Sequence, residues 1–401
     1  MLHLLPRRPA RSLRLSRPAR LGAVAAASLC VATLGSAAPT TAGGADAAVR
    51  PVAARTALVP PAQQPPASAT NPTNPLAGHR WGTYAGGAEM AWAPYAAATG
   101  TTRTLLGRIA LQPKAKWFGA WIADDEIGDK VREYVANATG GDPDVLVQLT
   151  TFRMVPWEHE ACRRLPTRAE QASYERWVDA FAAALGDTRA AVVVQPDGPF
   201  AACAPGRSLL PSRMVGYTVR ALEALPRTDV YVEVGSAGWN HLRPGEALRL
   251  LLPAGIEVAR GFHLNTTHYE PTARQVRFGA AVVRALATRG IRGKHFTVDT
   301  AQNGRGFTWE WHRDHVAGRF DSAPTCRTRR QTHCVTLGIP PTTDVASPRW
   351  GLPADVARLA ARHVDAYLWS GRPWLRRQAS PFLLDRALAV AWTTPFSPPI
   401  G

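Results

Sequence analysis

The chain has 401 residues, 46% of them hydrophobic, and its 47 Lys and Arg against 30 Asp and Glu give a net charge of +17. A chain of this length and apolar content can bury a large core, which excludes a wholly disordered protein and a small disulfide-dependent domain. The charge would suit nucleic acid. However, the excess consists of scattered arginines in a chain also rich in Ala, Gly and Pro, as GC-rich codons produce. We therefore expect no nucleic-acid partner.

The first 47 residues have the pattern of a secretion signal. Six arginines precede an apolar run over residues 21–34, and small residues follow it, which is the order found in export signals. The run is shorter than the roughly 20 apolar residues that cross a bilayer, so we expect no stable membrane anchor. Cleavage after Ala47 fits the pattern, as does cleavage after Ala37 or Ala38. The sequence thus predicts a secreted protein.

Four cysteines lie beyond that segment: Cys162, Cys203, Cys326 and Cys334. In an exported protein an even number of cysteines indicates two disulfide bonds, although four cysteines allow three connectivities. Pairing the closest partners in sequence would join the first two and the last two. No CxxC pair and no HExxH motif occurs, so we expect no metal site.

Residues 48–75 are dominated by Ala, Pro, Thr and Val. Such a segment cannot bury enough apolar surface to order itself, and we expect a disordered tail or linker ahead of a single catalytic domain over residues 76–401. In that domain, short runs rich in Val, Tyr, Phe or Thr alternate with longer amphipathic stretches. The predicted strands are 145–151, 190–195, 229–234, 261–265, 295–299 and 364–369. The predicted helices are 124–138, 167–185, 211–225, 244–251, 272–289, 353–362 and 384–391.

The alternation of strand and helix predicts an α/β fold with a parallel sheet, either doubly wound or closed into a barrel. In both architectures the working residues gather at the carboxyl ends of the strands. Acidic residues occur at several of these ends, including Asp197, Glu233 and Asp299, and Trp residues lie near them. Sugar hydrolysis needs this combination, because one carboxylic acid protonates the leaving oxygen, another group activates water and aromatic rings stack on the sugar.

Other chemistries lack their usual motifs. The sequence contains no GxSxG, no GxxxxGK[ST] and no GxGxxG. Serine-hydrolase, P-loop and dinucleotide-binding functions are therefore not indicated, and we expect no cofactor.

Three segments resemble glycoside hydrolase family 6, the cellulase family of endoglucanases and cellobiohydrolases. Residues 192–197, Val-Val-Val-Gln-Pro-Asp, are similar to the family's Ile-Glu-Pro-Asp motif. Residues 231–239, Tyr-Val-Glu-Val-Gly-Ser-Ala-Gly-Trp, resemble its Tyr-Leu-Asp-Ala-Gly-His-Ala-Gly-Trp motif, and residues 117–121 resemble its first strand. The similarity extends over about residues 76–396.

The resemblance implies a distorted parallel β/α barrel, TIM-like with about seven strands, that hydrolyses β-1,4-glucan with inversion. Asp197 would be the general acid, and Trp121 and Trp239 would stack on the substrate. An inverting enzyme holds its two carboxyl groups about 6.5–9.5 Å apart to leave room for a water. The full set of candidate substrate-binding residues is Trp121, Trp239, Asn265, His268 and Trp369.

The chain departs from the family pattern at three places. Ala161 replaces the aspartate that adjusts the acid's pKa, so Glu160 or Glu158 would have to substitute, and Glu233 stands in as a supporting carboxylate for the strand aspartate. The late loop that carries the family's proposed base is replaced by residues 371–377, Gly-Arg-Pro-Trp-Leu-Arg-Arg. No carboxylate occurs between Asp365 and Asp385.

These observations leave three functions open. The first is a secreted, monomeric, endo-acting hydrolase of a β-glucan, with water activated through Glu160 or a water chain; the short late loop favours an open cleft. The second is a carbohydrate-binding barrel that has lost catalysis. The third is a binder of anionic polymers, supported by the basic charge and by Arg372, Arg376 and Arg377.

Overall fold

A computed structural model describes residue 71 and residues 73–396. The predicted secretion signal and most of the predicted tail lie outside the described residues. Across the described part of the chain, seven strands form one sheet. They are β1 (Lys116–Gly119), β2 (Val147–Phe152), β3 (Ala190–Val194), β4 (Thr228–Glu233), β5 (Gly261–Leu264), β6 (His295–Asp299) and β7 (Val364–Leu368). The six strands predicted from composition are confirmed to within two residues, and β1 lies where the family resemblance placed a strand.

Helices follow most of the strands. The α-helices are α1 (Trp92–Ala97), α2 (Gly100–Ala110), α3 (Ile127–Thr139), α4 (Glu158–Ala161), α5 (Arg168–Leu185), α6 (Leu210–Glu223), α7 (Pro244–Leu251), α8 (Thr272–Ala287), α9 (Trp309–His315), α10 (Ala354–His363) and α11 (Leu384–Thr393). Short 3₁₀ turns are η1 (Gly198–Cys203), η2 (Pro205–Arg207), η3 (Phe320–Ser322), η4 (Pro348–Trp350) and η5 (Arg376–Gln378). All seven predicted helices are present.

The sequence did not predict α1, α2, α4 or α9. Helix α2 shows why, since its sequence GTTRTLLGRIA contains two Gly and three Thr, residues of low helix propensity. The helix buries Leu106 and Ile109 in a cluster that includes Val390 of α11. Tertiary packing therefore stabilises this helix, and its local sequence does not.

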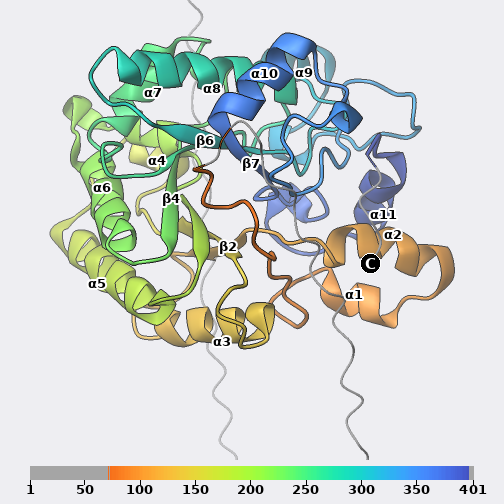
Figure 1. Cartoon of the computed structure of the whole chain (residues 1–401), viewed down its shortest axis with the longest axis horizontal. Helices are drawn as coiled ribbons and strands as arrows, with labels where there is room; N and C mark the ends of the chain where they lie inside the picture. The colour runs from red at the N-terminus through yellow and green to blue at the C-terminus, as the bar shows by residue number, and fades with distance from the viewer. Residues whose placement is uncertain (1–70, 72, 397–401) are drawn as a thin grey trace, which may run out of the picture. The chain divides into compact units, whose positions relative to one another are not determined.

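The strands lie in sequence order, β1 to β7, and every neighbouring pair is parallel. Figure 1 shows the helices arranged around the outside of the strands, with α1, α2 and α11 grouped together. The sheet is a curled parallel half-barrel, and its seven parallel strands confirm the distorted parallel β/α barrel that the family resemblance implied. Because all the strands run the same way, their carboxyl ends meet at one edge.

Two apolar layers fill the barrel. The inner layer includes Ala191 and Val193 of β3, Tyr231 of β4 and Leu368 of β7. A larger outer cluster joins the alternate strand residues to the surrounding helices. The strands are buried on both faces, which explains why they read as short continuous apolar runs.

Asp365 is a buried charge at the centre of the barrel's amino-terminal end. Its two oxygens accept bonds of 2.8 and 2.9 Å from the Arg260 guanidinium, and one accepts 2.7 Å from the Tyr231 hydroxyl. Asn71 Nδ2 donates to the carboxylate at 2.8 Å, and Asn74 Nδ2 donates to the Asp365 carbonyl at 2.7 Å. Both asparagines are buried, so the end of the segment predicted as a tail packs on the domain.

The two ends of the sheet meet without a strand ladder. The Ala115 amide donates 2.8 Å to the Trp369 carbonyl, and the Trp117 indole donates 2.7 Å to the Ser370 carbonyl. These bonds join the start of β1 to the residues after β7. They place Trp117 beside the loop that replaces the family's base loop.

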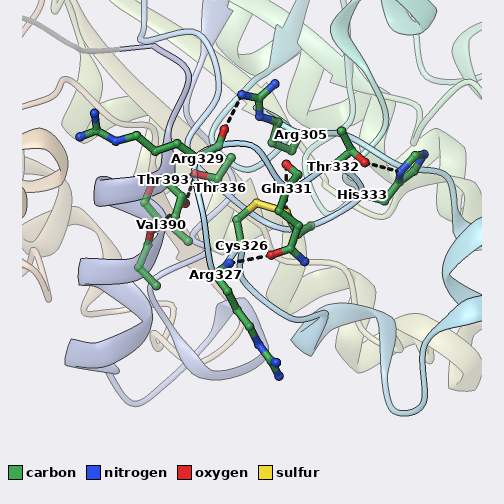
Figure 2. The surroundings of a disulfide bond; sticks show 12 residues. Arg305, Cys326, Arg327, Arg329, Gln331, Thr332, His333, Thr336, Val390 and Thr393 are labelled. Carbon is green, nitrogen blue, oxygen red and sulfur yellow. Dashed lines mark hydrogen bonds between the residues drawn. A yellow bond between two sulfur atoms is a disulfide. The ribbon is translucent and has the colours of Figure 1, made fainter.

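Two disulfides tie loops at the carboxyl edge. Cys162 bonds to Cys203, and Cys326 bonds to Cys334, which confirms the closest-neighbour pairing. Figure 2 shows the second bond, where the Arg305 guanidinium donates 2.7 Å to the Arg329 carbonyl. Just after it, the Thr336 hydroxyl donates 2.9 Å to the Val390 carbonyl of α11. The loop that follows η3 is therefore anchored to the rest of the domain.

The Asp365 cluster should dominate the stability of the barrel. We expect Asp365→Asn to lower the free energy of unfolding by about 3–5 kcal/mol, because it leaves Arg260 largely buried without its counter-charge. As a control, Asp355→Asn breaks an ion pair with Arg277 in which both side chains are about half exposed, and should cost under about 1 kcal/mol. Urea unfolding measures both, and equal losses would contradict a special role for Asp365.

Candidate active site

A cleft of about 720 Å³ opens at the carboxyl edge of the sheet. Its walls come from the loops after several strands, and they combine carboxylates, arginines and aromatic rings. The aromatic lining consists of Trp117, Trp121, Phe152, Phe200, Trp239, Trp309 and Phe320. The charged lining consists of Glu158, Asp197, Glu310, Arg313, Asp321, Arg372 and Arg377.

Asp197 lies in this cleft, three residues beyond β3. Its backbone takes the left-handed conformation with φ 60°, and its Oδ1 accepts a 2.8 Å bond from the Thr267 hydroxyl. Burial raises the pKa of Asp197 to about 7; the Thr267 bond opposes the rise, and the charges of Glu158 and Asp321 add to it. A carboxyl with this pKa keeps its proton in weakly acidic solution, as a general acid must.

Glu233 supports the turn that carries Asp197. Its Oε2 accepts a 3.2 Å bond from the Gly198 amide, and the side chain is buried. Burial, followed by the charge of Asp197, raises the pKa of Glu233 well above its ordinary value. Gly198 is required here, since a Cβ would lie 2.2 Å from the Glu233 carbonyl oxygen. Glu233 thus holds the backbone just after Asp197 and is not among the residues that line the cleft.

Trp121 and Trp239 both line the cleft, as the resemblance implied. Trp121 follows β1, and its side chain is 55% exposed, which leaves the ring available to a ligand. Trp239 follows β4, and Glu270 holds its turn by accepting bonds from the Ser236 hydroxyl at 2.8 Å and the Gly238 amide at 3.0 Å.

His268 also lines the cleft, next to Trp239. The two rings lie 5.0 Å apart, and His268 Nδ1 is 3.2 Å from the Thr267 hydroxyl that bonds Asp197. Burial lowers the pKa of His268 to about 4. The ring is therefore neutral near pH 7, where it offers a hydrogen-bonding and packing surface without a charge.

Two predicted substrate-binding residues lie elsewhere. Asn265 is fully buried, and its Nδ2 donates 3.1 Å to the Asp299 carbonyl. Trp369 is also fully buried, and its indole donates 2.8 Å to the Ile339 carbonyl. Both side chains use their polar groups inside the fold, and neither lines the cleft. A strand-end position alone did not distinguish cleft residues from core residues.

Glu160 likewise lies outside the cleft. Its carboxylate accepts 2.7 Å from Arg164 on the next turn of chain, and the side chain is 56% exposed in that pair. Glu158, two residues earlier, lines the cleft instead and raises the pKa of Asp197. A left-handed φ of 47° at Glu158 redirects the chain there, and a sequence pattern does not reveal such a turn.

The loop that replaces the family's base loop is tightly placed. The Asp299 carboxylate accepts 2.7 Å from the Gly371 amide, and a Cβ on Gly371 would lie 2.5 Å from that oxygen. Arg372 then lies over the Trp117 ring, 4.4 Å from its centroid. Arg372 and Arg377 both reach the cleft. Asp299 is therefore an anchor for the loop, behind the cleft wall.

Sequence reasoning missed several cleft residues: Trp309, Glu310, Arg313, Phe320 and Asp321. All five belong to the long β6–β7 connection, in which the sequence predicted only the helix over 353–362. Thr308 begins α9 by accepting 3.1 Å from the Trp311 amide, a capping signal that could have located the helix. In the described part of the chain, no group of three His, Cys, Asp or Glu could hold a metal ion.

A carboxyl of raised pKa in an aromatic cleft, at the carboxyl edge of a curled parallel sheet, is an arrangement that suits a glycoside hydrolase. A family model described as "Glycosyl hydrolases family 6" matches residues 81–373, and the chain belongs to this family. Endoglucanase 1 of Streptomyces halstedii is 30% identical over 273 residues, 66% of this chain and 80% of that protein. Endoglucanase A of Cellulomonas fimi is 30% identical over 234 residues, 57% of this chain and 48% of that protein.

Solved structures of glycoside hydrolases share the fold of this chain. The endoglucanase Cel6 from Mycobacterium tuberculosis, in complex with methyl-cellobiosyl-4-deoxy-4-thio-β-D-cellobioside, has a TM-score of 0.60 and 26% identity over 79% of this chain and 98% of its own. The catalytic core of a cellobiohydrolase from Chaetomium thermophilum has a TM-score of 0.56 at 16% identity, covering 80% of this chain and 98% of its own. The second likeness supports the fold alone.

The pKa of Asp197 should depend on Glu158 and not on Glu160. Glu158→Gln removes a negative charge that favours the protonated acid, so the pKa of Asp197 should fall below about 7. Glu160→Gln, the matched control, should leave it unchanged. Carbon-13 NMR titration of the aspartate carboxyl carbons measures the shift. The same response in both variants would contradict the placement of Glu158.

Proposed function

We propose that this protein is an endo-acting hydrolase of β-1,4-glucan that inverts the anomeric centre, with Asp197 as its general acid. The observation that carries the proposal is the pKa of about 7 at Asp197, in a cleft whose walls hold Trp121 and Trp239. The relatives named endoglucanase and the solved endoglucanase with a bound cellobioside support cellulose-type glucan as the substrate.

The chemistry follows from the cleft. The aromatic rings stack on the apolar faces of successive glucose units and fix the chain across Asp197. Asp197 donates its proton to the glycosidic oxygen as the bond to the anomeric carbon breaks. The developing negative charge on Asp197 is accommodated by the Thr267 hydroxyl, which already donates to its Oδ1. Glu233 and Gly198 keep the turn rigid meanwhile.

A sugar-binding barrel without catalysis is the competing function. It is favoured by the loop over residues 371–377, where the sequence has no carboxylate and Arg372 and Arg377 reach the cleft. The two functions differ in one measurable property. A binder would retain cello-oligosaccharides and release no sugar.

Purified protein should hydrolyse hydroxyethyl cellulose, and the viscosity should fall well before reducing ends accumulate, since an endo enzyme cuts within chains. Asp197→Asn should lower the rate by two to four orders of magnitude, the contribution of general acid catalysis, while cellotetraose binding by calorimetry survives. Activity of the variant on 2,4-dinitrophenyl β-cellobioside, whose leaving group needs no proton, should be largely retained. No hydrolysis by the unmodified protein would favour the binding barrel, and an unchanged rate in Asp197→Asn would remove Asp197 from the mechanism.

We also propose that the protein is exported. The arginine-rich, apolar and small-residue order of residues 1–47 supports this, as do two disulfides, which persist in oxidising compartments. Among the described residues no helix is long and apolar enough to cross a membrane. Amino-terminal sequencing of the protein recovered from the medium should begin at Ala48, or after Ala37 or Ala38. Recovery of the intact chain inside the cell alone would contradict export.

A further inference from the structure

The proposed hydrolysis needs a base that this chain does not carry in the family's usual loop. An inverting reaction requires a second group that takes a proton from the attacking water on the side opposite the acid. Residues 371–377 provide no carboxylate. The base must therefore come from another element, and the inference below rests on the hydrolysis proposed above.

Besides Asp197, three carboxylates line the cleft: Glu158, Glu310 and Asp321. Glu310 is held by its own backbone amide, the Thr308 hydroxyl, Arg274 and Arg313, which together lower its pKa, so it is a weak base. Glu158 begins α4, and the Cys162–Cys203 disulfide ties the end of α4 to η1, the turn that follows Asp197. Glu158 thus belongs to the acid's own side of the cleft.

Asp321 comes from a different wall. It lies in η3, within the β6–β7 connection, whereas Asp197 follows β3, three strands away in the sheet. The side chain is exposed to the cleft, so water can reach it. Its charge raises the pKa of Asp197, which lines the same cleft. Glu310 is also exposed and belongs to the same connection, but its lowered pKa makes it the weaker base, which leaves Asp321 as the better candidate.

The loop that begins at residue 371, in place of the family's base loop, contacts the turn that carries Asp321. Turn η3 packs against η5, so residues 376–378 lie beside residues 320–322. The backbone at Arg377 is left-handed, with φ 50°, and its guanidinium charge acts on Asp321. The loop that lost the family's carboxylate therefore contributes a cation to a carboxylate from the neighbouring connection.

Asp321 is also held in place from the other side. Four residues beyond η3, Cys326 forms its disulfide with Cys334, and Figure 2 shows the bonds that anchor this loop at Arg305 and at Val390 of α11. Phe320, its preceding neighbour, packs its ring 5.5 Å from His268 and 4.9 Å from Tyr269. The chain is therefore fixed on both sides of Asp321, which positions its carboxylate for proton transfer.

The protonation states fit two different roles. Burial raises the pKa of Asp321 above its ordinary value, and the charges of Arg319, Arg377 and His312 offset only part of that rise. No cation acts on Asp197, whose pKa rises to about 7 partly because Asp321 is negative. The pair therefore favours one proton, on Asp197, with Asp321 ionised, which is the arrangement of an acid and a base.

We propose that Asp321 is the catalytic base. Its carboxylate takes a proton from a water molecule while the water oxygen forms a bond to the anomeric carbon. The bond from that carbon to the glycosidic oxygen breaks, its electron pair stays on the oxygen, and Asp197 supplies the proton. One water is consumed, the new hydroxyl has the inverted configuration, and the two carboxyls exchange protons with solvent before the next cycle.

The test compares Asp321 variants with the acid variant. Asp321→Asn should lower kcat on hydroxyethyl cellulose by two to four orders of magnitude with little change in KM. Asp321→Asn should also hydrolyse 2,4-dinitrophenyl β-cellobioside slowly, whereas Asp197→Asn should keep most of its activity on this substrate. Adding azide to Asp321→Ala should restore turnover of that substrate and yield the α-cellobiosyl azide. The acidic limb of kcat/KM against pH should flatten in Asp321→Asn, because the group that must ionise is gone.

Controls make each outcome decisive. Asp355→Asn, far from the cleft lining, should match the unmodified enzyme, and Glu158→Ala and Glu310→Ala should give no azide product. If Asp321→Asn does not fold by circular dichroism, Asp321→Glu serves instead, with reduced kcat and a retained acidic limb. A kcat within tenfold of normal in Asp321→Asn, or azide rescue at Glu158, would overturn the assignment while leaving the hydrolase intact. Absence of activity in the unmodified enzyme would instead refute the hydrolase itself.

Discussion

The common direction of the seven strands is the constraint on which the rest of this structure depends. Because every neighbouring pair is parallel, the loops after all seven strands emerge at one edge, and the cleft is built from them. The opposite edge carries stability instead, where Asp365 joins Arg260, Tyr231 and the chain entering the barrel. Chemistry and stability thus occupy opposite ends of the same sheet.

Buried carboxyls at the carboxyl edge serve different purposes. Glu233 fixes the turn at Gly198, Asp299 fixes Gly371, and Glu270 fixes the turn before Trp239. Among the described carboxyls with a raised pKa, only Asp197 and Asp321 line the cleft, and Asp197 is the one whose pKa reaches about 7. Desolvation raises all these pKa values, so a raised pKa alone does not mark a candidate acid, and a place in the cleft wall is needed as well.

The β6–β7 connection shows how a family's site changes while its fold is kept. The late loop has lost its carboxylates, but it packs on η3 and places Arg377 near Asp321. The disulfide in the same connection fixes a segment with little regular structure. A disulfide between residues close in sequence thereby restrains the conformation of a long loop, as hydrogen bonds of the sheet restrain the strands.

The sequence by itself determined six of the seven strands, most helices and the candidate positions of Asp197, Trp121 and Trp239, because these depend on local apolar patterns and on motifs next to strand ends. Tertiary structure alone decided that Glu158 and not Glu160 lines the cleft, that Asn265 and Trp369 are buried, and that Asp321 lines the same cleft as Asp197. The reason is physical. Left-handed turns, loop-to-loop packing and desolvation join residues far apart in the chain, and no local pattern records those contacts.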